Sequence, residues 1–233
     1  ILLDGFGSLS FPEEVISELS KVGIELRIFS PFFSTNSLYI GRRLHHKIVV
    51  SDCKTVLIGG INIAEKYHGT STKEPWLDYA VEINDETIAE SLQKLCRDIY
   101  LKNRIIRRKK IISNYENGEV NSISVLQNDW LKRKNEVFKT YIGQINTAEK
   151  EIVILSSYFL PGKRLTNALK KASLKGVKIK LILSGISDVP MARRASCHLY
   201  TKLLRYNIEL YGWKKSVLHG KIAVIDANWT TIG

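Results

Sequence analysis

The sequence predicts an α/β fold built from two related modules. Apolar, strand-like runs alternate along the chain with segments whose apolar residues recur at helical spacing, a pattern typical of helices layered on sheets. The pattern His-x-Lys-x4-Asp, with a glycine after six further residues, occurs twice. The tripeptide Ile-Glu-Leu recurs ahead of both copies, so a whole module is repeated and not only a motif. The copies consist of His45, Lys47, Asp52 and Gly59, and of His219, Lys221, Asp226 and Gly233.

The first module is expected over residues 1–113. Short apolar runs predict strands at 1–8, 24–30, 47–52, 55–60 and 79–83. A turn at Cys53 and Lys54 joins the third strand to the fourth. Helices are predicted at 11–23 and 85–105, where apolar residues recur every three or four positions. Asp85 is the expected N-cap of the second helix.

The second module is expected over residues 123–233, after a linker at 114–122. The linker is polar and contains the turn pair Asn117-Gly118. Gly176 is the expected C-terminal cap of a helix that ends at it. The expected helices are 130–148, 162–176 and 195–207, and the expected strands are 151–159, 177–188, 208–213, 221–226 and 230–233.

Composition narrows the range of partners. The chain has 35 basic and 23 acidic side chains, a net charge of +12 that indicates a polyanion, either nucleic acid or anionic lipid. The densest basic cluster lies within 104–110, and such a run is more often a solvated helix face than a binding site. No apolar run is long enough for a membrane span, and no secretory leader is visible. Cys53, Cys96 and Cys197 lie far apart, which argues against a disulfide framework and a structural zinc site and favours a reducing compartment.

The repeated motif indicates phosphoryl-transfer chemistry. Residues i and i+2 of a strand point to one face, so each histidine and its lysine should project together. If the modules pack face to face, two histidines and two lysines converge on one pocket. The lysines would bind phosphate oxygens, and the histidines would supply a nucleophile and a general acid. The alternative is a pair of structural histidines. His46 is expected on the opposite strand face, and His68 and His198 on the surface.

The doubled motif resembles that of the phospholipase D superfamily and, within it, bacterial cardiolipin synthases. Similar stretches occur throughout the chain: LLDGFGS, LHHKIVVSD, IGGINIAEKY, PWLDYAVEI, SYFLPGKRL and LHGKIAVID. The resemblance implies two pseudo-twofold-related modules, each a mixed sheet flanked by helices, with the active site at their interface. It also implies that this sequence is an internal part of a longer protein, since the second copy ends at Gly233 and lacks the serine and asparagine that follow in the family.

The resemblance also implies residue roles. The catalytic set would be His45, Lys47, Asp52, His219, Lys221 and Asp226. His45 would attack phosphorus, His219 would protonate the leaving alcohol, and both lysines would hold phosphoryl oxygens. Asp52 and Asp226 would be structural supports, because an odd separation turns them away from their lysines. Substrate-binding residues would be Asn62, Gly60, which replaces a serine of many relatives, and Asp78, which would orient an imidazole.

The resemblance therefore implies a phosphatidyltransferase that makes cardiolipin from two phosphatidylglycerol molecules through a phosphohistidine, releasing glycerol. No metal or other cofactor is expected. The expected partners are an anionic phospholipid and the bacterial membrane surface, reached from the cytoplasmic side as a peripheral protein or through anchors outside this sequence. Nucleic acid is not expected. The alternatives are a phospholipase D-like hydrolase or nuclease, and a non-catalytic binding protein. The loop at 30–43, which is ten residues longer than its counterpart, would contribute specificity.

Overall fold

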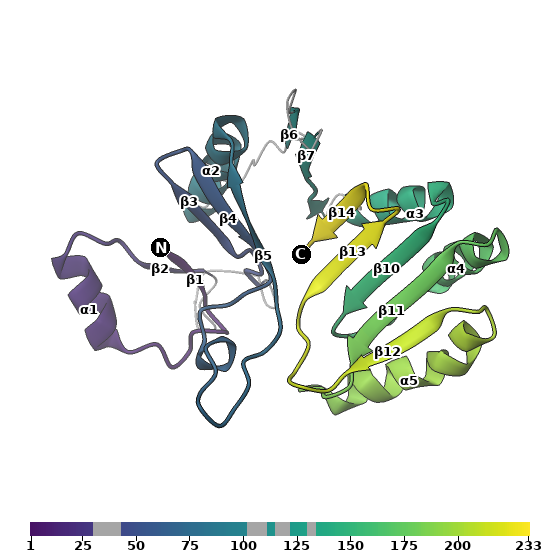
Figure 1. Ribbon diagram of the computed structural model, residues 1–233. Coiled ribbons are helices and arrows are strands. Elements are labelled where there is room, and N and C mark those ends of the chain that lie inside the picture. Colours follow the sequence, from purple (N-terminus) through teal and green to yellow (C-terminus); the bar gives the residue numbers. More distant parts are fainter. Residues whose placement is uncertain (30–42, 102–110, 115–121, 130–133) are drawn as a thin grey trace.

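The computed structural model describes residues 1–29, 43–101, 111–114, 122–129 and 134–233. Strands and helices alternate along the chain as expected, so the predicted α/β class is confirmed. In Figure 1 the sheet of residues 48–84 and the larger sheet of residues 151–232 face each other across the middle of the molecule.

The second half forms one mixed five-stranded sheet with β10 at its centre. Strand β10 pairs in parallel with β11, and β11 pairs in parallel with β12. On its other side β10 pairs antiparallel with β13, which pairs with β14. The order is β12 (Glu209–Trp213), β11 (Lys178–Ser184), β10 (Glu151–Ser156), β13 (Lys221–Ile225) and β14 (Trp229–Ile232).

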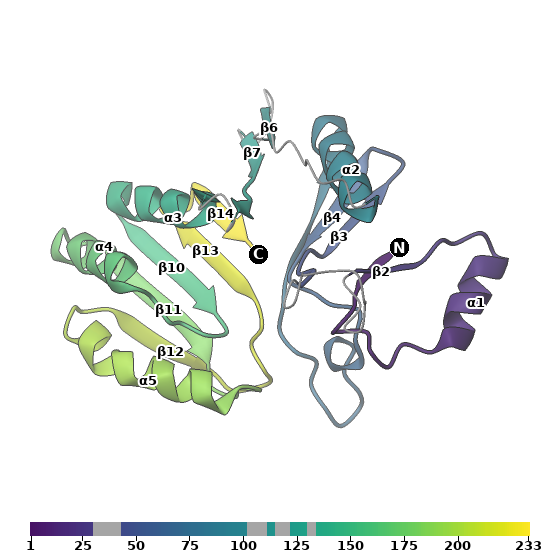
Figure 2. The same cartoon turned by 180° about the vertical axis from the view of Figure 1, so that it is seen from behind.

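Three helices cover the face of this sheet that points away from β3–β5, as Figures 1 and 2 show. They are α3 (Glu136–Thr147), α4 (Lys163–Leu174) and α5 (Pro190–Leu204). Alternate strand residues such as Ile152, Ile179 and Leu181 are buried against them, because successive side chains of a strand point to opposite faces. This core fixes the ends of the strands that carry the second motif.

The first half contains two separate sheets. Strands β1 (Leu2–Asp4) and β2 (Arg27–Phe29) pair in parallel. Strands β3 (Ile48–Ser51), β4 (Thr55–Gly59) and β5 (Ala80–Asn84) form an antiparallel sheet. Helix α2 (Glu86–Tyr100) packs on that sheet, whereas α1 (Glu13–Lys21) buries no residue and η1 (Glu65–Tyr67) lies in the loop before β5. The Asp85 carboxylate accepts a 2.7 Å hydrogen bond from the Ile88 N–H, so the predicted N-cap is confirmed.

The order of elements explains why the first half is divided. In the second half β10 lies between β11 and β13 and joins them into one sheet. Among the described residues of the first half, no strand lies between β1 and β3, the counterparts of β11 and β13. A cavity of about 480 Å³ lies there, lined by Leu2, His46, Ile48, Cys96 and others. His46 therefore points into this cavity rather than joining the histidine motif.

Several predicted boundaries were wrong. The helix expected at 130–148 begins only at Glu136, because Lys134–Asn135 (β9) pairs with Asn128–Asp129 (β8). The helix expected at 195–207 begins at Pro190, a residue whose fixed φ suits a first helical turn. The strand expected at 1–8 is limited to β1, since a turn follows Asp4.

Some expectations fall on residues outside the described ranges. They are the basic cluster within 104–110 and, except for Arg43, the long loop at 30–43. Either side of 115–121, β6 (Ile111–Asn114) pairs antiparallel with β7 (Ser122–Val125). Within the described residues, no helix combines the length and apolar character needed to cross a membrane.

Candidate active site

Each copy of the motif begins a β-hairpin of the same design. The hairpins are β3–β4 and β13–β14. The Gly59 N–H donates to the Lys47 carbonyl at 3.3 Å, and the Gly233 N–H donates to the Lys221 carbonyl at 3.0 Å. The spacing from lysine to glycine is therefore the length of one hairpin. The histidines were expected on strands, but His45 and His219 precede the strands that follow them.

The motif aspartates form the hairpin turns. Asp52 and Cys53 have φ values of 50° and 54°, and Asp226 and Ala227 have values of 52° and 57°. Two consecutive positive φ angles define a type I′ turn, and aspartate tolerates this conformation better than most residues. The Asp226 carboxylate also accepts hydrogen bonds of 2.8 Å from the N–H groups of residues 149, 150 and 151. These bonds lower the pKa of Asp226. Both aspartates lie at the hairpin end remote from the lysines.

The two motif lysines make the same contact and repel each other. The Lys47 Nζ donates to the His45 carbonyl at 3.0 Å, and the Lys221 Nζ donates to the His219 carbonyl at 2.7 Å. Loss of hydration lowers the pKa of both lysines, and the charge of Lys221 lowers the pKa of Lys47 further. An anion bound near both lysines would relieve this repulsion.

Backbone pairing between the two halves of the chain brings Asp78 to His219. The Leu77 N–H donates to the Val217 carbonyl at 2.9 Å, and the Leu77 carbonyl accepts from the N–H groups of His219 and Gly220 at 2.8 and 3.0 Å. The Asp78 Oδ2 then lies 2.7 Å from the His219 Nδ1. The Asp78 side chain is 1% exposed, so this carboxylate is almost wholly shielded from water. This contact leaves the His219 Nε2 as the ring nitrogen free for chemistry.

Two glycines make room for this contact. A Cβ at Gly60 would lie 2.3 Å from the Asp78 Oδ1, and a Cβ at Gly220 would lie 2.7 Å from the Tyr79 ring. Neither position can therefore take a side chain unless the Asp78 carboxylate or the Tyr79 ring moves. For Gly60 the structure shows a close approach to Asp78, and substrate contact by this residue stays a prediction.

Tyr67 and Trp76 were not predicted to belong to the site. The Tyr67 hydroxyl accepts a 3.0 Å hydrogen bond from the Asn62 Nδ2 and lies 3.1 Å from the His219 Nδ1. The rings of Tyr67 and Trp76 lie with their centroids 5.9 and 5.8 Å from that of His219. Burial raises the pKa of Tyr67. Trp76 stands two residues before Asp78 in the stretch PWLDYAVEI, and Tyr67 ends the stretch IGGINIAEKY. Both stretches carry the family resemblance, a signal that could have pointed to these residues.

His45 has a different environment from His219. Partial loss of hydration lowers the pKa of His45, and the cations Lys47 and Arg43 lower it further. Arg43 is held in place by Asp4, which its Nη2 approaches to 2.8 Å, and it lies over the Phe6 ring. Thus cations act on one motif histidine, opposed in part by Asp4, and the other histidine is paired with a buried carboxylate.

The loops after β10 and β11 add a further polar pair. The Tyr158 hydroxyl donates to the Asp188 carboxylate, and burial together with this bond raises the pKa of Tyr158. Asp188 also acts on Lys221, whose pKa it raises against the larger effect of lost hydration. No group of three or more His, Cys, Asp or Glu side chains in the described part of the chain is arranged to hold a metal ion.

Comparison with known proteins finds similarity to cardiolipin synthases. Residues 141–233 match the family model described as cardiolipin synthase, phospholipase D-like domain. Cardiolipin synthase B of Escherichia coli (strain K12) is 31% identical over the whole chain, and cardiolipin synthase 1 of Bacillus cereus is 27% identical. The chain spans 58% and 48% of these two relatives, respectively.

Among solved structures, the fold resembles phosphatidylserine synthase of Haemophilus influenzae. The TM-score is 0.54 at 17% identity, over 79% of this chain and 52% of that one. Polyphosphate kinase of Porphyromonas gingivalis gives a TM-score of 0.50 at 15% identity, over 93% of this chain and 32% of that one. At these identities the likeness concerns the fold alone.

Proposed function

We propose that the chain is a phosphatidyltransferase of the phospholipase D superfamily that makes cardiolipin. The match of residues 141–233 to the family model described as cardiolipin synthase, phospholipase D-like domain, supports this proposal. The substrates would be two phosphatidylglycerol molecules, and the second product glycerol. The observation that carries the proposal is the duplicated His-Lys hairpin, of which one histidine is held by a buried carboxylate from the other half of the chain. Such an arrangement supplies a nucleophile and an acid that differ in environment.

The proposed site lies between two modules, 1–113 and 123–233, joined by the linker 114–122 and related by a pseudo-twofold axis. The matching hairpins support this arrangement, and so does the pairing of Leu77 with residues 217–220. The charge of Lys221 also acts on His45 and Lys47, which belong to the first motif.

His45 is the proposed nucleophile. Its lowered pKa keeps the imidazole neutral near pH 7, as attack on phosphorus requires. A ring nitrogen of His45 would form a bond to phosphorus as the bond from phosphorus to the glycerol oxygen breaks. Lys47, Lys221 and Asn62 would stabilise the charge on the nonbridging oxygens, with Gly60 allowing the close approach of Asp78.

His219 is the proposed acid and base. Its Nε2 would give a proton to the departing glycerol oxygen, while Asp78 stabilises the imidazolium through Nδ1. His219 would then take the proton of the acceptor hydroxyl of a second phosphatidylglycerol. That oxygen would attack phosphorus, and the bond from His45 to phosphorus would break. Water in place of the acceptor would give hydrolysis, with the same residues in the same roles.

The proposed substrate implies work at a membrane surface, which we place on the cytoplasmic side of a bacterial membrane. The net charge of +12 is consistent with an anionic lipid surface. Asp52 and Asp226 would hold the hairpin turns and take no part in proton transfer.

The experiment follows radiolabelled phosphatidylglycerol in detergent micelles by thin-layer chromatography. Wild type should give cardiolipin and glycerol, and His45→Ala or His219→Ala should lower the rate at least about 10²-fold, because each supplies one essential step. His198→Ala, a substitution of an exposed histidine on α5, is the matched control and should keep the wild-type rate. If phosphatidic acid is the main product, the protein is a hydrolase and the proposed transfer activity is wrong. If no phosphodiester is turned over, a non-catalytic binding protein is favoured.

A further inference from the structure

The end of the molecule that carries the motif histidines also exposes apolar side chains. The loop after β11 exposes Ile186 and Val189, and the first turn of α5 exposes 81% of Met191. The loop after β1 exposes Phe6 and Leu9 in the same way. Two further apolar residues, Ile61 and Ile63, are exposed directly after Gly60. We call these residues the apolar rim: Phe6, Leu9, Ile61, Ile63, Ile186, Val189 and Met191.

The rim is connected to both motif histidines by equivalent hydrogen bonds. The Asp4 carboxylate accepts from the N–H of Leu44, the residue before His45, at 2.8 Å. The Ser184 hydroxyl accepts from the N–H of Leu218, the residue before His219, at 3.3 Å. In both halves a glycine and then an exposed apolar residue follow, namely Gly5-Phe6 and Gly185-Ile186. The loops that carry the rim are therefore anchored on both sides of the candidate site.

Sheet register places the basic residues of two helix starts at the same end. Ser156, the last residue of β10, pairs with Lys221, and α4 and α5 begin beyond the ends of β10 and β11. Their first residues include four exposed cations and no acidic residue. Acidic residues would be favoured there by the helix dipole, so the cations are not explained by helix stability. These cations are Lys163, Arg164, Arg193 and Arg194.

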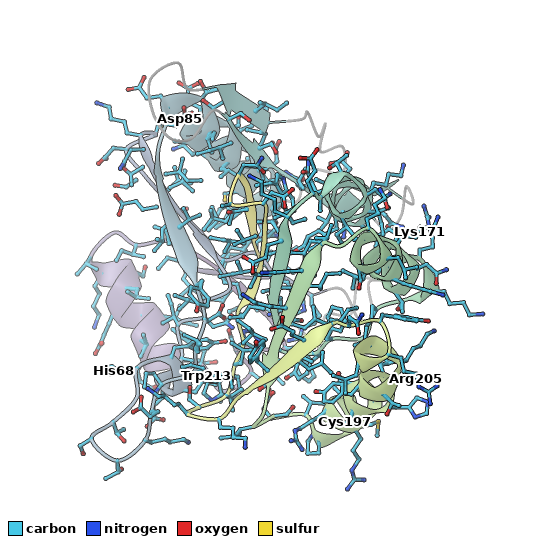
Figure 3. The ribbon with its side chains drawn as sticks, turned by 45° about the vertical axis from the view of Figure 1, so that its right-hand side comes forward. His68, Asp85, Lys171, Cys197, Arg205 and Trp213 are labelled. Carbon is cyan, nitrogen blue, oxygen red and sulfur yellow. The ribbon has the colours of Figure 1, made fainter. Side chains whose placement is uncertain are left out.

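Figure 3 shows the separation of the two ends. His68, which follows η1, and Trp213, the last residue of β12, lie at the lower left and mark the end with the motif histidines. Lys171 and Arg205 lie on the right, near the C-terminal ends of α4 and α5, and mark the opposite end. Leu174 and Leu204, 76% and 55% exposed, lie at those C-terminal ends. They offer matched apolar positions remote from the rim.

We propose that the apolar rim inserts into the surface of an anionic lipid bilayer, with the four cations at the headgroups, so that the candidate site opens directly onto the lipid. The proposal rests on the proposed function in that the substrate is a phospholipid of that bilayer. Single apolar side chains on separate loops, flanked by basic residues, fit the boundary between headgroups and acyl chains. A lipid substrate could then reach the histidines without leaving the membrane surface entirely.

The test is co-sedimentation of the protein with sucrose-loaded vesicles of phosphatidylglycerol and phosphatidylcholine in equal parts. The double variant Ile186→Ser/Met191→Ser should lower the partition coefficient about tenfold or more, since each removes several buried carbons from the bilayer. The matched control Leu174→Ser/Leu204→Ser should stay within about twofold of wild type. Arg193→Gln/Arg194→Gln should weaken binding by about tenfold or more on these vesicles and change little on pure phosphatidylcholine.

Thermal unfolding of each variant separates misfolding from lost binding. If Ile186→Ser/Met191→Ser does not fold, Phe6→Ser/Leu9→Ser tests the rim from the other half of the chain. Equal vesicle binding by rim and control variants would overturn the proposal, as would wild-type binding to duplex DNA without binding to vesicles. If vesicle binding depends on the apolar rim but phosphatidylglycerol is not turned over, the proposed membrane-binding surface is supported and the proposed function is overturned.

Discussion

Replacing Asp78 by asparagine removes the charge opposite His219 while keeping the size of the side chain. The Asp78 Oδ2 lies 2.7 Å from the His219 Nδ1, and the carboxylate is 1% exposed. A unit charge pair at about 4 Å and an effective dielectric constant of about 20 is worth about 4 kcal/mol. If this stabilisation is realised when His219 becomes an imidazolium in the transition state, its loss lowers kcat about 10³-fold. Substrate binding by the lysines should persist, so KM should change little.

The assay is steady-state transfer of labelled phosphatidylglycerol in micelles, with thermal unfolding measured in parallel. Asp226→Asn is the matched control, since the Asp226 carboxylate holds three backbone N–H groups at the hairpin turn and touches no motif histidine. We expect Asp226→Asn to lower the melting temperature and to leave the rate per folded molecule near wild type. The assignment of roles to these carboxylates fails if Asp78→Asn keeps more than about a tenth of the wild-type kcat. It also fails if kcat per folded molecule falls as far in Asp226→Asn as in Asp78→Asn.

The remaining predictions concern the shape, polarity and charge of the same site. Gly60→Ser should lower kcat/KM about tenfold or more, because its Cβ would lie 2.3 Å from the Asp78 Oδ1. Gly143→Ser is the control and should leave kcat/KM unchanged, because nothing lies within 4 Å of a Cβ at that position. Tyr67→Phe keeps the ring but releases Asn62 and the His219 Nδ1, so kcat should fall about tenfold, and an unchanged kcat would contradict a positioning role. Arg43→Gln should raise the pKa of His45, because the Arg43 charge lowers it. The acid limb of the plot of kcat/KM against pH should therefore move to higher pH. A move to lower pH would contradict His45 as the nucleophile. Activity should survive EDTA because Lys47 and Lys221 supply the positive charge that a metal would supply, and Asn62 can add a hydrogen bond to the same oxygens. Loss of activity on chelation, restored by a divalent ion, would contradict this.

The fold class and the two motif hairpins were predictable because they follow local periodicity and turn residues. The two hairpins begin and end close to where alternation and turn residues place them. The N-cap at Asp85 also follows from adjacent residues. By contrast, the start of α3 was wrong because the preceding residues pair with residues 128–129, a contact that helical periodicity does not encode.

The motif histidines, lysines and Asp78 could be singled out from the sequence, but their surroundings could not. Tyr67 approaches His219 across 152 positions of sequence, and that contact depends on the pairing of Leu77 with residues 217–220. The Asp78 carboxylate reaches His219 through the same pairing, whereas Arg43 acts on His45 from only two residues away along the chain. Long-range register, rather than residue type, decides this part of the site.

One of the positions at which the two motif copies differ lies directly after the motif histidine. The residue after the motif histidine is His46 in the first copy and Gly220 in the second. At Gly220 the Tyr79 ring leaves no space for a Cβ, whereas His46 lines an open cavity. After duplication, a side chain could therefore have accumulated in the first copy but not in the second. The second tripeptide, His-Gly-Lys, should therefore be accepted at either site. The first, His-His-Lys, should not be accepted at residues 219–221 unless the Tyr79 ring moves, because a Cβ there would lie 2.7 Å from that ring.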